Sequence, residues 1–373
     1  MFVVFSHPTT LLYFCKQKVL IMLHINYMPP KYLFTSQIPS EITILADQSA
    51  VNITVKSEDK EIFTTTLYTY NQKATFYDLR SIIESNIEQQ NTVFANFSIY
   101  ANTTTDSTNT NSCCFIYARC NINDITAFDY IQKHFLTTLS SYTIPRSAVQ
   151  ALTFCLLPGQ TLKSYTECLV QKNGESIPQT FIVDEGNITG SDKISLQTVT
   201  ISPQQLLKKV NISGKLLSFT IHRGAIAKTF YVIDKEPNLQ LLVSNEFNCI
   251  EYIYLTCVTR RKLNLDRSTV TSLGTESFYD DKSTFEHEVE SSMLSLEEAS
   301  RLAILLLSHN INIAEGEDTN IPIIITDLSS EISDADNATN SIKFKYKYAQ
   351  HLFPVTLKPI TNIFSHTFNP TFD

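Results

Sequence analysis

The clearest pattern in the chain is an unbroken alternation of apolar and cationic residues from Ile342 to Tyr348. In an extended strand, successive side chains point to opposite faces. The alternation therefore puts Ile342, Phe344, Tyr346 and Tyr348 on one face and three lysines on the other. This stretch predicts a strand in a sheet with one buried face.

A capped helix is predicted upstream of that strand. Ser295 and Glu298 have the spacing of a capping box, in which each side chain bonds to the backbone N–H of the other residue. An apolar stripe with helical spacing follows, and it predicts a helix over 296–309. The stripe consists of Leu296, Ala299, Leu302, Ala303 and Leu306.

The rest of the chain reads as short strands with a few short helices. In a first region, 29–145, alternation predicts a hairpin of 42–46 with 51–55 across a turn at 47–49, and then a strand at 62–70. A helix is predicted after Asp78 as N-cap. Further predictions are strands at 93–99 and 114–119, an exposed loop at 101–112 and a short helix near 125–135.

Two further regions follow. In 146–245 we predict strands at 149–157, 179–183, 194–201, 216–221 and 227–233, with a helical turn at 202–210. In 246–348 we predict strands at 250–258 and 321–326, with two short paired strands around Gly274. The predicted fold class is mainly β (α+β): multi-domain antiparallel β-sandwich-like modules with a few short helices. Residues 349–373 form a tail.

The N-terminal residues 1–28 are an extension of doubtful role. They are apolar but interrupted by lysines, and no run reaches the ~18 residues that a membrane span needs. No signal-peptide pattern is present either. We expect Met22 or Met28 to be the working start, so that the first 21 residues contribute nothing to the fold.

Composition excludes several classes of function. The net charge of −8 argues against a nucleic-acid binder, and the run Arg260-Arg261-Lys262 is typical of a solvated strand edge. With 8 glycines in 373 residues, there is no clustered loop to cradle a phosphate or a dinucleotide. The eight cysteines have no zinc-ligand spacing and read as reduced core thiols.

Candidate chemistry is sparse. Glu286, Glu288 and Glu290 share one strand face, with Asp280 and Asp281 nearby, and are candidate calcium ligands. A second acidic cluster comprises Asp327, Glu331, Asp334 and Asp336. Neither has a calcium-loop pattern, so we interpret both as ordinary solvated or turn residues. His287 falls on the apolar side of its strand and reads as a core or interface histidine. We expect no enzyme, no catalytic residue, no cofactor and no metal.

The candidate interaction residues lie at the C-terminal end. The last predicted strand contributes Tyr346 and Tyr348, and the tail contributes Phe353, Phe364 and Phe368. That amount of apolar surface is costly to leave in water, at roughly 1.5–3 kcal/mol per large side chain. The tail is therefore expected either to fold back on its own domain or to insert into a neighbouring subunit.

Several segments together resemble an uncharacterised family of Bacteroidales proteins. They are Phe247-Asn248-Cys249 through Arg267-Ser268, Phe278-Tyr279-Asp280, Phe285-Glu286-His287-Glu288, Leu296-Glu297-Glu298-Ala299, Ile324-Ile325-Thr326-Asp327, Glu331-Ile332-Ser333-Asp334, Tyr77 to Glu84, and His134 to Thr138. The resemblance covers about Met22 to Tyr348. It implies a place in prophage or phage-like gene sets, where large β-rich proteins build virions or tails.

The leading hypothesis is therefore a structural or assembly component of a phage-like particle, most simply a tail or baseplate protein. Its partners would be itself, as a homo-oligomer, and other particle proteins, with no nucleic acid and no membrane. It would be found in the virion, or in the host cytoplasm during assembly. The alternative is a surface or secreted binding module for a glycan or a protein. Assembly predicts a ring or co-purification with particle proteins, whereas a binding module predicts a monomer with a concave, Tyr-lined face.

Overall fold

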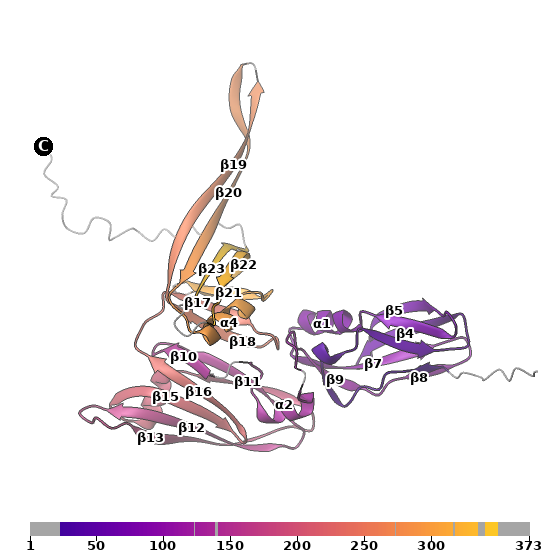
Figure 1. The fold of residues 1–373 in the computed structure, drawn as a ribbon, viewed down its shortest axis with the longest axis horizontal. Coiled ribbons are helices and arrows are strands. Elements are labelled where there is room, and N and C mark those ends of the chain that lie inside the picture. Colours follow the sequence, from indigo (N-terminus) through magenta and orange to yellow (C-terminus); the bar gives the residue numbers. More distant parts are fainter. Residues whose placement is uncertain are drawn as a thin grey trace, which may run out of the picture.

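The computed structural model describes residues 23–122, 124–138, 141–272, 274–315, 318–334 and 340–349. The protein is mainly β, as predicted, and its strands form several sheets that are largely antiparallel. These sheets group into three modules, each with its own apolar core. In Figure 1 the first module (indigo) lies beside the second (magenta), and a long ribbon rises from the third (orange).

The first module is a β-sandwich. A three-stranded sheet, β1-β3-β6, faces a larger sheet, β2-β9-β7-β4-β5, and β8 pairs with β7. Ile42 and Ile44 of one sheet share a core with Val51 and Ile53 of the other. The elements are β1 (His24–Ile25), β2 (Tyr32–Phe34), the 3-10 turn η1 (Thr35–Gln37), β3 (Glu41–Leu45), β4 (Ala50–Ser57), β5 (Lys60–Tyr68), β6 (Lys73–Tyr77), α1 (Leu79–Gln89), β7 (Phe94–Asn102), β8 (Ser107–Asn109) and β9 (Cys113–Ile116).

One pairing prediction in this module was wrong, and two other local predictions were right only in part. The strands β3 and β4 do not form a hairpin, because β3 pairs with β1 and β6 while β4 pairs with β5 and β7. The chain between them crosses from one sheet to the other. Asp78 does precede α1, but its backbone is left-handed (φ 64°) and its side chain makes no capping bond. The loop predicted at 101–112 contains the short strand β8.

The second module packs a two-stranded sheet, β11-β14, with a five-stranded sheet, β10-β16-β15-β12-β13. Every residue of β11 is buried, since one of its faces points to this core and the other contacts the first and third modules. The elements are α2 (Ala127–Lys133), which precedes the module, and β10 (Ser141–Pro145), β11 (Gln150–Leu156), β12 (Thr161–Lys172), β13 (Gln179–Thr189), β14 (Ser195–Ile201), α3 (Pro203–Val210), β15 (Gly214–Arg223) and β16 (Ile226–Ile233).

The third module is a seven-stranded sheet in the order β18-β17-β21-β22-β23-β20-β19, and α4 packs on it. The capping box of α4 is confirmed, with both reciprocal bonds present. Within the stripe, Leu302 is buried but Leu296 is 45% exposed. The elements are β17 (Leu239–Ser244), β18 (Ile250–Leu255), β19 (Cys257–Ser272), β20 (Thr275–Ser291), α4 (Leu296–Leu305), β21 (Ile311–Glu315), β22 (Asp318–Glu331) and β23 (Ser341–Tyr348).

Sheet membership refines the predicted borders between regions. β10 lies in the predicted first region but pairs with β16 of the second module, and β17 lies in the predicted second region but belongs to the sheet of the third module. The interpretation of the second acidic cluster as turn residues was partly wrong, because Asp327 and Glu331 lie in the strand β22. A separate apolar cluster, which includes Phe34, Ile131, Cys155 and Phe247, joins the three modules.

Candidate interaction site

The ribbon formed by β19 and β20 is the most prominent feature of the surface. β20 pairs with β23 only from His287 to Glu290, whereas β19 and β20 pair with each other over their whole length. Beyond His287, no third strand of the described chain supports the ribbon, which projects from the molecule in Figure 1. Both of its edges therefore present unpaired backbone groups, and an isolated two-stranded ribbon is marginally stable in water.

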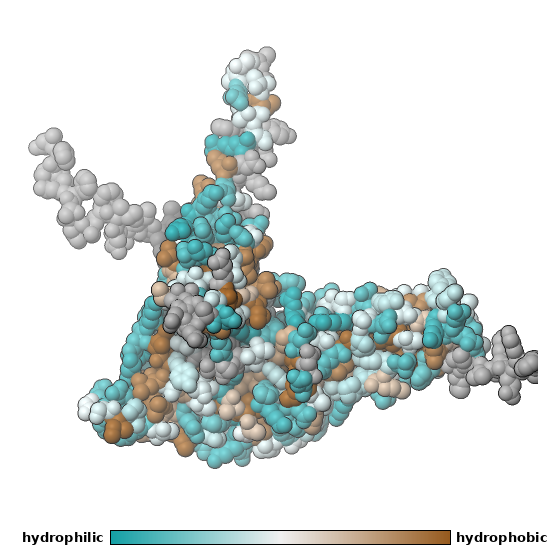
Figure 2. All heavy atoms as spheres, viewed as in Figure 1, coloured by the Kyte–Doolittle hydropathy of each residue, from teal (hydrophilic) through white to brown (hydrophobic). Residues whose placement is uncertain are grey.

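Apolar side chains continue from the core along one face of the ribbon. Val289 is fully buried at the base, and in the antiparallel register Phe285 and its partner Leu263 share its face. The Arg261 guanidinium lies 3.8 Å from the centre of the Phe285 ring. Farther out, Leu263 is 53% and Leu265 47% exposed. Figure 2 shows such hydrophobic patches between hydrophilic residues along the ribbon.

The opposite face carries a ladder of charges. Glu288 lies between Arg260 of β19 and Lys345 of β23, and Glu290 lies opposite Lys343, with which it forms a 3.0 Å ion pair. Lys345 forms a 3.3 Å ion pair with Asp327 of β22, which raises the pKa of this lysine. The acidic row is thus flanked by cations on both sides. Among the described residues, no group of three His, Cys, Asp or Glu side chains is arranged to hold a metal.

The predicted contact tyrosines of β23 lie at the base of the ribbon. Tyr346 is 1% exposed and stacks on His287, with 4.7 Å between ring centres, and Tyr348 meets the same histidine edge-on at 5.1 Å. His287 is 7% exposed, in agreement with a core histidine. Tyr346 therefore packs in the core and Tyr348, which is half-buried, lies at its margin. Phe353, Phe364 and Phe368 lie outside the described residues.

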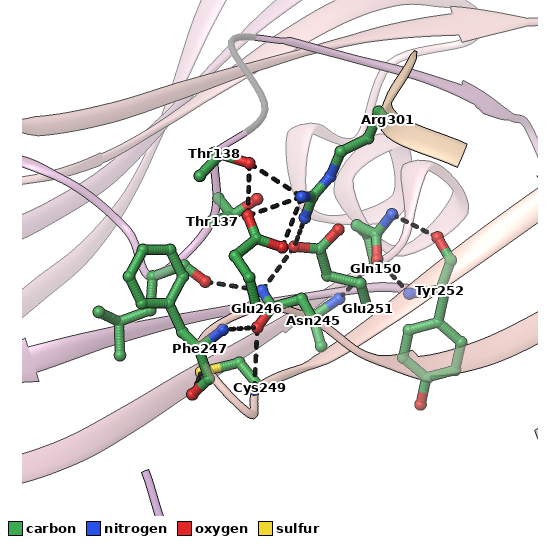
Figure 3. A network of polar contacts seen from close by, with 12 residues as sticks. Thr137, Thr138, Gln150, Asn245, Glu246, Phe247, Cys249, Glu251, Tyr252 and Arg301 are labelled. Carbon is green, nitrogen blue, oxygen red and sulfur yellow. Dashed lines mark hydrogen bonds and ion pairs between the residues drawn. The ribbon is translucent and has the colours of Figure 1, made fainter. Parts of the chain in front are cut away.

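A buried charge cluster lies where the modules meet, and Figure 3 shows its side chains converging. Arg301 of α4 donates to both oxygens of Glu246, at 2.6 and 2.5 Å, and to Glu251 at 2.8 Å. All three side chains are at most 6% exposed. Arg301 also donates to Thr138 at 2.8 Å. Burial alone lowers the pKa of Arg301, but the two carboxylates outweigh it and the net shift is upward.

Neighbouring amides extend this cluster across the modules. Asn245 donates to Glu251 at 2.6 Å and to the Leu136 carbonyl at 2.9 Å. Gln150 of β11 exchanges two hydrogen bonds with the backbone of Tyr252 in β18. The segment before β10, the strand β11 and the helix α4 are thereby held together. Both carboxylates of the cluster are paired with Arg301, so the cluster has a structural role and holds the modules together. We call Arg301, Glu246 and Glu251 the clamp.

Sequence reasoning did not single out Arg301, Glu246 or Glu251. A signal was present, since Arg301 sits beside Leu302 and four residues before Leu305, on the flank of the apolar stripe. A charged residue there points partly toward the core and needs a partner. The partners come from a segment some fifty residues earlier, so helical periodicity did not identify them.

No protein-family model matches this chain, and no curated protein matches it. A solved structure of the full extracellular region of plexin A4 is similar over 87% of this chain and 39% of that one, with 10% identity and a TM-score of 0.21. The chain thus spans well under half of that structure, and at this TM-score the likeness carries no argument. No helix of the described chain is both long and apolar enough to cross a membrane.

Proposed function

We propose that this protein is a structural and assembly subunit, and that it serves in a phage-like particle as a tail or baseplate component. The observation that carries the assembly role is the ribbon of β19 and β20. The setting in a particle rests on the resemblance to Bacteroidales proteins described above. The subunit acts by shape and contact, and the proposal requires no catalytic residue.

The ribbon has the properties of a docking element. Its strands of 16 and 17 residues extend beyond their sheet and expose Leu263 and Leu265 to water. Burying each leucine on a partner is worth about 1.5–3 kcal/mol when complete. A partner that covers the ribbon also pairs with its open backbone edges. Association thus supplies the stabilisation that the ribbon lacks in the single chain.

The clamp at Arg301 gives the ribbon a firm base. The helix α4 packs on β22 and β23, and β23 pairs with β20. Arg301 ties this helix to Glu246, Glu251 and the segment before the second module. A force applied to the ribbon by a docked partner is therefore passed to the sheet of the third module and to its neighbours.

Shortening the ribbon tests this function. Replacement of residues 262–286 by Asn-Gly leaves Arg261 and His287, which are paired in the native register, on either side of a two-residue hairpin turn. The shortened chain should melt within a few degrees of the full chain and lose self-association or co-purification with particle proteins. Native-like association by the shortened chain, measured by light scattering, would contradict the proposal.

An alternative is a surface or secreted module that binds a protein or a glycan. One observation favours it: an open groove of about 990 Å³ between the first and second modules, lined partly by Tyr32 and Phe128. The two functions differ in the oligomeric state that they require. A chain that stays monomeric at high concentration, and that binds an added protein or glycan through this groove, would favour the alternative.

A further inference from the structure

The groove just mentioned is built from three segments that are distant in the sequence. They are the residues around β2, the start of α2 and the end of β11. Tyr32, Ala127 and Leu157 are at most 8% exposed and also belong to the apolar cluster that joins the modules. The groove is therefore part of a packed junction, with a firm apolar floor.

Aromatic rings form one side of the groove. Phe128, which is 42% exposed, stacks on Tyr32 with 6.0 Å between ring centres and an interplanar angle of 24°. The Lys31 ammonium lies 5.4 Å from the centre of the Tyr32 ring. Gln37 donates to the carbonyls of Ile122 and Ile125, so its amide is already engaged by the fold. The surface thus favours an apolar ligand with rings or prolines.

A free strand edge runs along the groove. β2 is the terminal strand of its sheet and has β9 on one side only. In this parallel pair the Cys114 N–H donates to the Lys31 carbonyl. Because consecutive residues of a strand turn their peptide groups to opposite sides, the N–H and C=O of Tyr32 point to the free edge. An extended segment in the groove would find two backbone partners there.

The sequence of the C-terminal segment matches this site. Residues 351–373 contain one lysine and one aspartate among many apolar residues. The prolines at 354, 359 and 370 favour extended backbone, both for themselves and for the residues before them. Extended, proline-containing segments dock in aromatic-lined grooves. The large apolar residues are Leu352, Phe353, Val355, Leu357, Ile360, Ile363, Phe364, Phe368 and Phe372.

We propose that the groove at Tyr32 and Phe128 receives the segment 351–373 of a second copy of the chain. This inference deepens the proposed assembly function and rests on it. In Figure 1, β23, from which the segment continues, lies in the third module. The groove is lined instead by residues of the first module, of α2 and of the end of β11. The contact joins two different surfaces and is head-to-tail, so repetition gives a ring or a filament.

The test uses full chains with complementary defects. The groove variant is Phe128→Asp, at a half-exposed position where the fold tolerates a polar side chain. The segment variant combines Phe353→Ser, Phe364→Ser and Phe368→Ser. A matched control is Tyr68→Asp, at an 81% exposed aromatic residue of β5. Phe128→Asp should weaken self-association about 30-fold or more, as for an aromatic hot spot, and Tyr68→Asp should leave it unchanged.

Mixing the two defective chains identifies the occupant. Sedimentation velocity is run at a protein concentration at which the wild type associates but a loss of affinity of about 30-fold leaves each variant alone as a single chain. The mixture should give a 1:1 complex, because the intact segment of one chain enters the intact groove of the other. A synthetic peptide of residues 351–373 should compete with wild-type association. Either a mixture that stays as single chains or a peptide without effect would overturn the inference.

The shortened-ribbon chain separates this inference from the proposed function. Loss of association in that chain, together with wild-type association of Phe128→Asp, would overturn the groove contact and leave the assembly function standing. A wild-type chain that never associates would overturn both. Association that requires both the ribbon and Phe128 would support both.

Discussion

At the scale of single residues, two buried arginines are paired with carboxylates, although the Nε of each has no hydrogen-bond partner among the described residues. Arg301 compensates Glu246 and Glu251 at the junction of the modules. In the second module, Arg223 is 1% exposed and donates to Glu185 at 2.6 Å. A buried pair is not by itself a source of net stability, but removing one partner leaves the other desolvated and uncompensated.

Arg301→Ala should therefore destabilise the protein by about 3–5 kcal/mol, because it leaves two buried carboxylates without their cation. Arg80→Ala is the matched control. It removes a 2.8 Å ion pair with Glu84, and the Arg80 side chain is 40% exposed to solvent. A surface pair of this kind contributes about 0–1 kcal/mol. Denaturant melts of both variants measure the difference. Equal losses would show that the junction cluster is not the clamp that we describe.

The buried thiols of β9 give a prediction for alkaline pH. Burial raises the pKa of Cys113 and of Cys114 from 9.0 to about 12. A thiol whose pKa is higher in the folded state stabilises the fold below pH 9, and this contribution is lost as the pH rises toward 12. Between pH 8 and 10.5 each thiol ionises in the unfolded chain but stays protonated in the folded one. The free energy of unfolding should therefore fall by about 2 kcal/mol per thiol over this range.

Cys113→Ala checks this sign. The variant lacks one titrating thiol, so its free energy of unfolding should fall by about 2 kcal/mol less than that of the wild type between pH 8 and 10.5. Urea melts at the two pH values measure the difference. An identical fall in both proteins would mean that Cys113 has an ordinary pKa in the folded state.

At the scale of elements, the sequence predicted a strand or helix correctly where the residues that define it lie within a few positions of one another. β23 has the predicted alternation, with Ile342, Phe344 and Tyr346 buried. In α4 the Ser295 hydroxyl accepts from the Glu298 N–H at 3.2 Å, and Glu298 accepts from the Ser295 N–H at 3.1 Å. These elements need no information about distant parts of the chain.

The elements that were not predicted depend on distant partners. β12 was not identified because its inward positions include Ser164 and Thr166, which look polar although both are at most 1% exposed. Their burial is tolerated because both hydroxyls donate to Glu185 of β13, at 2.9 and 3.4 Å. For the same reason, alternation in β3 and β4 predicted two strands correctly but did not predict which strands they pair with.

The helix α4 allows a direct comparison of capping with burial. Ser295→Ala removes one cap and half of the capping box and should cost ~1 kcal/mol. Leu302→Ala, at a 4% exposed position of the stripe, should cost ~2–5 kcal/mol because it leaves a cavity. Thermal melts rank the two changes. A larger loss for Ser295→Ala would show that the stripe packs less tightly than the structure indicates.

At the scale of the whole molecule, the account has three parts. Three β-rich modules are joined by an apolar cluster and a buried charge clamp. A ribbon projects from the third module with open edges and exposed leucines. A groove between the first and second modules offers a second contact surface. We propose that the subunit assembles through the ribbon, with the groove as a further contact.

Residues 1–21 lie outside the described part of the chain, and we predict that the fold does not require them. A chain begun at Met22 should melt within a few degrees of the full chain, because residues of the described chain by themselves form three packed apolar cores. Differential scanning calorimetry of the two proteins makes the comparison. A larger drop in melting temperature for the shorter chain would assign residues 1–21 a part in the fold.

The most direct test of the central claim is hydrogen exchange of the ribbon at low and at high protein concentration. Peptides that cover 262–286 should exchange rapidly in the single chain, because this part of the ribbon has two open edges. At concentrations where the protein assembles, or when particle proteins are added, the same amides should become protected, while peptides from the core of β11 stay unchanged. Rapid exchange of the ribbon in the assembled state would contradict the account.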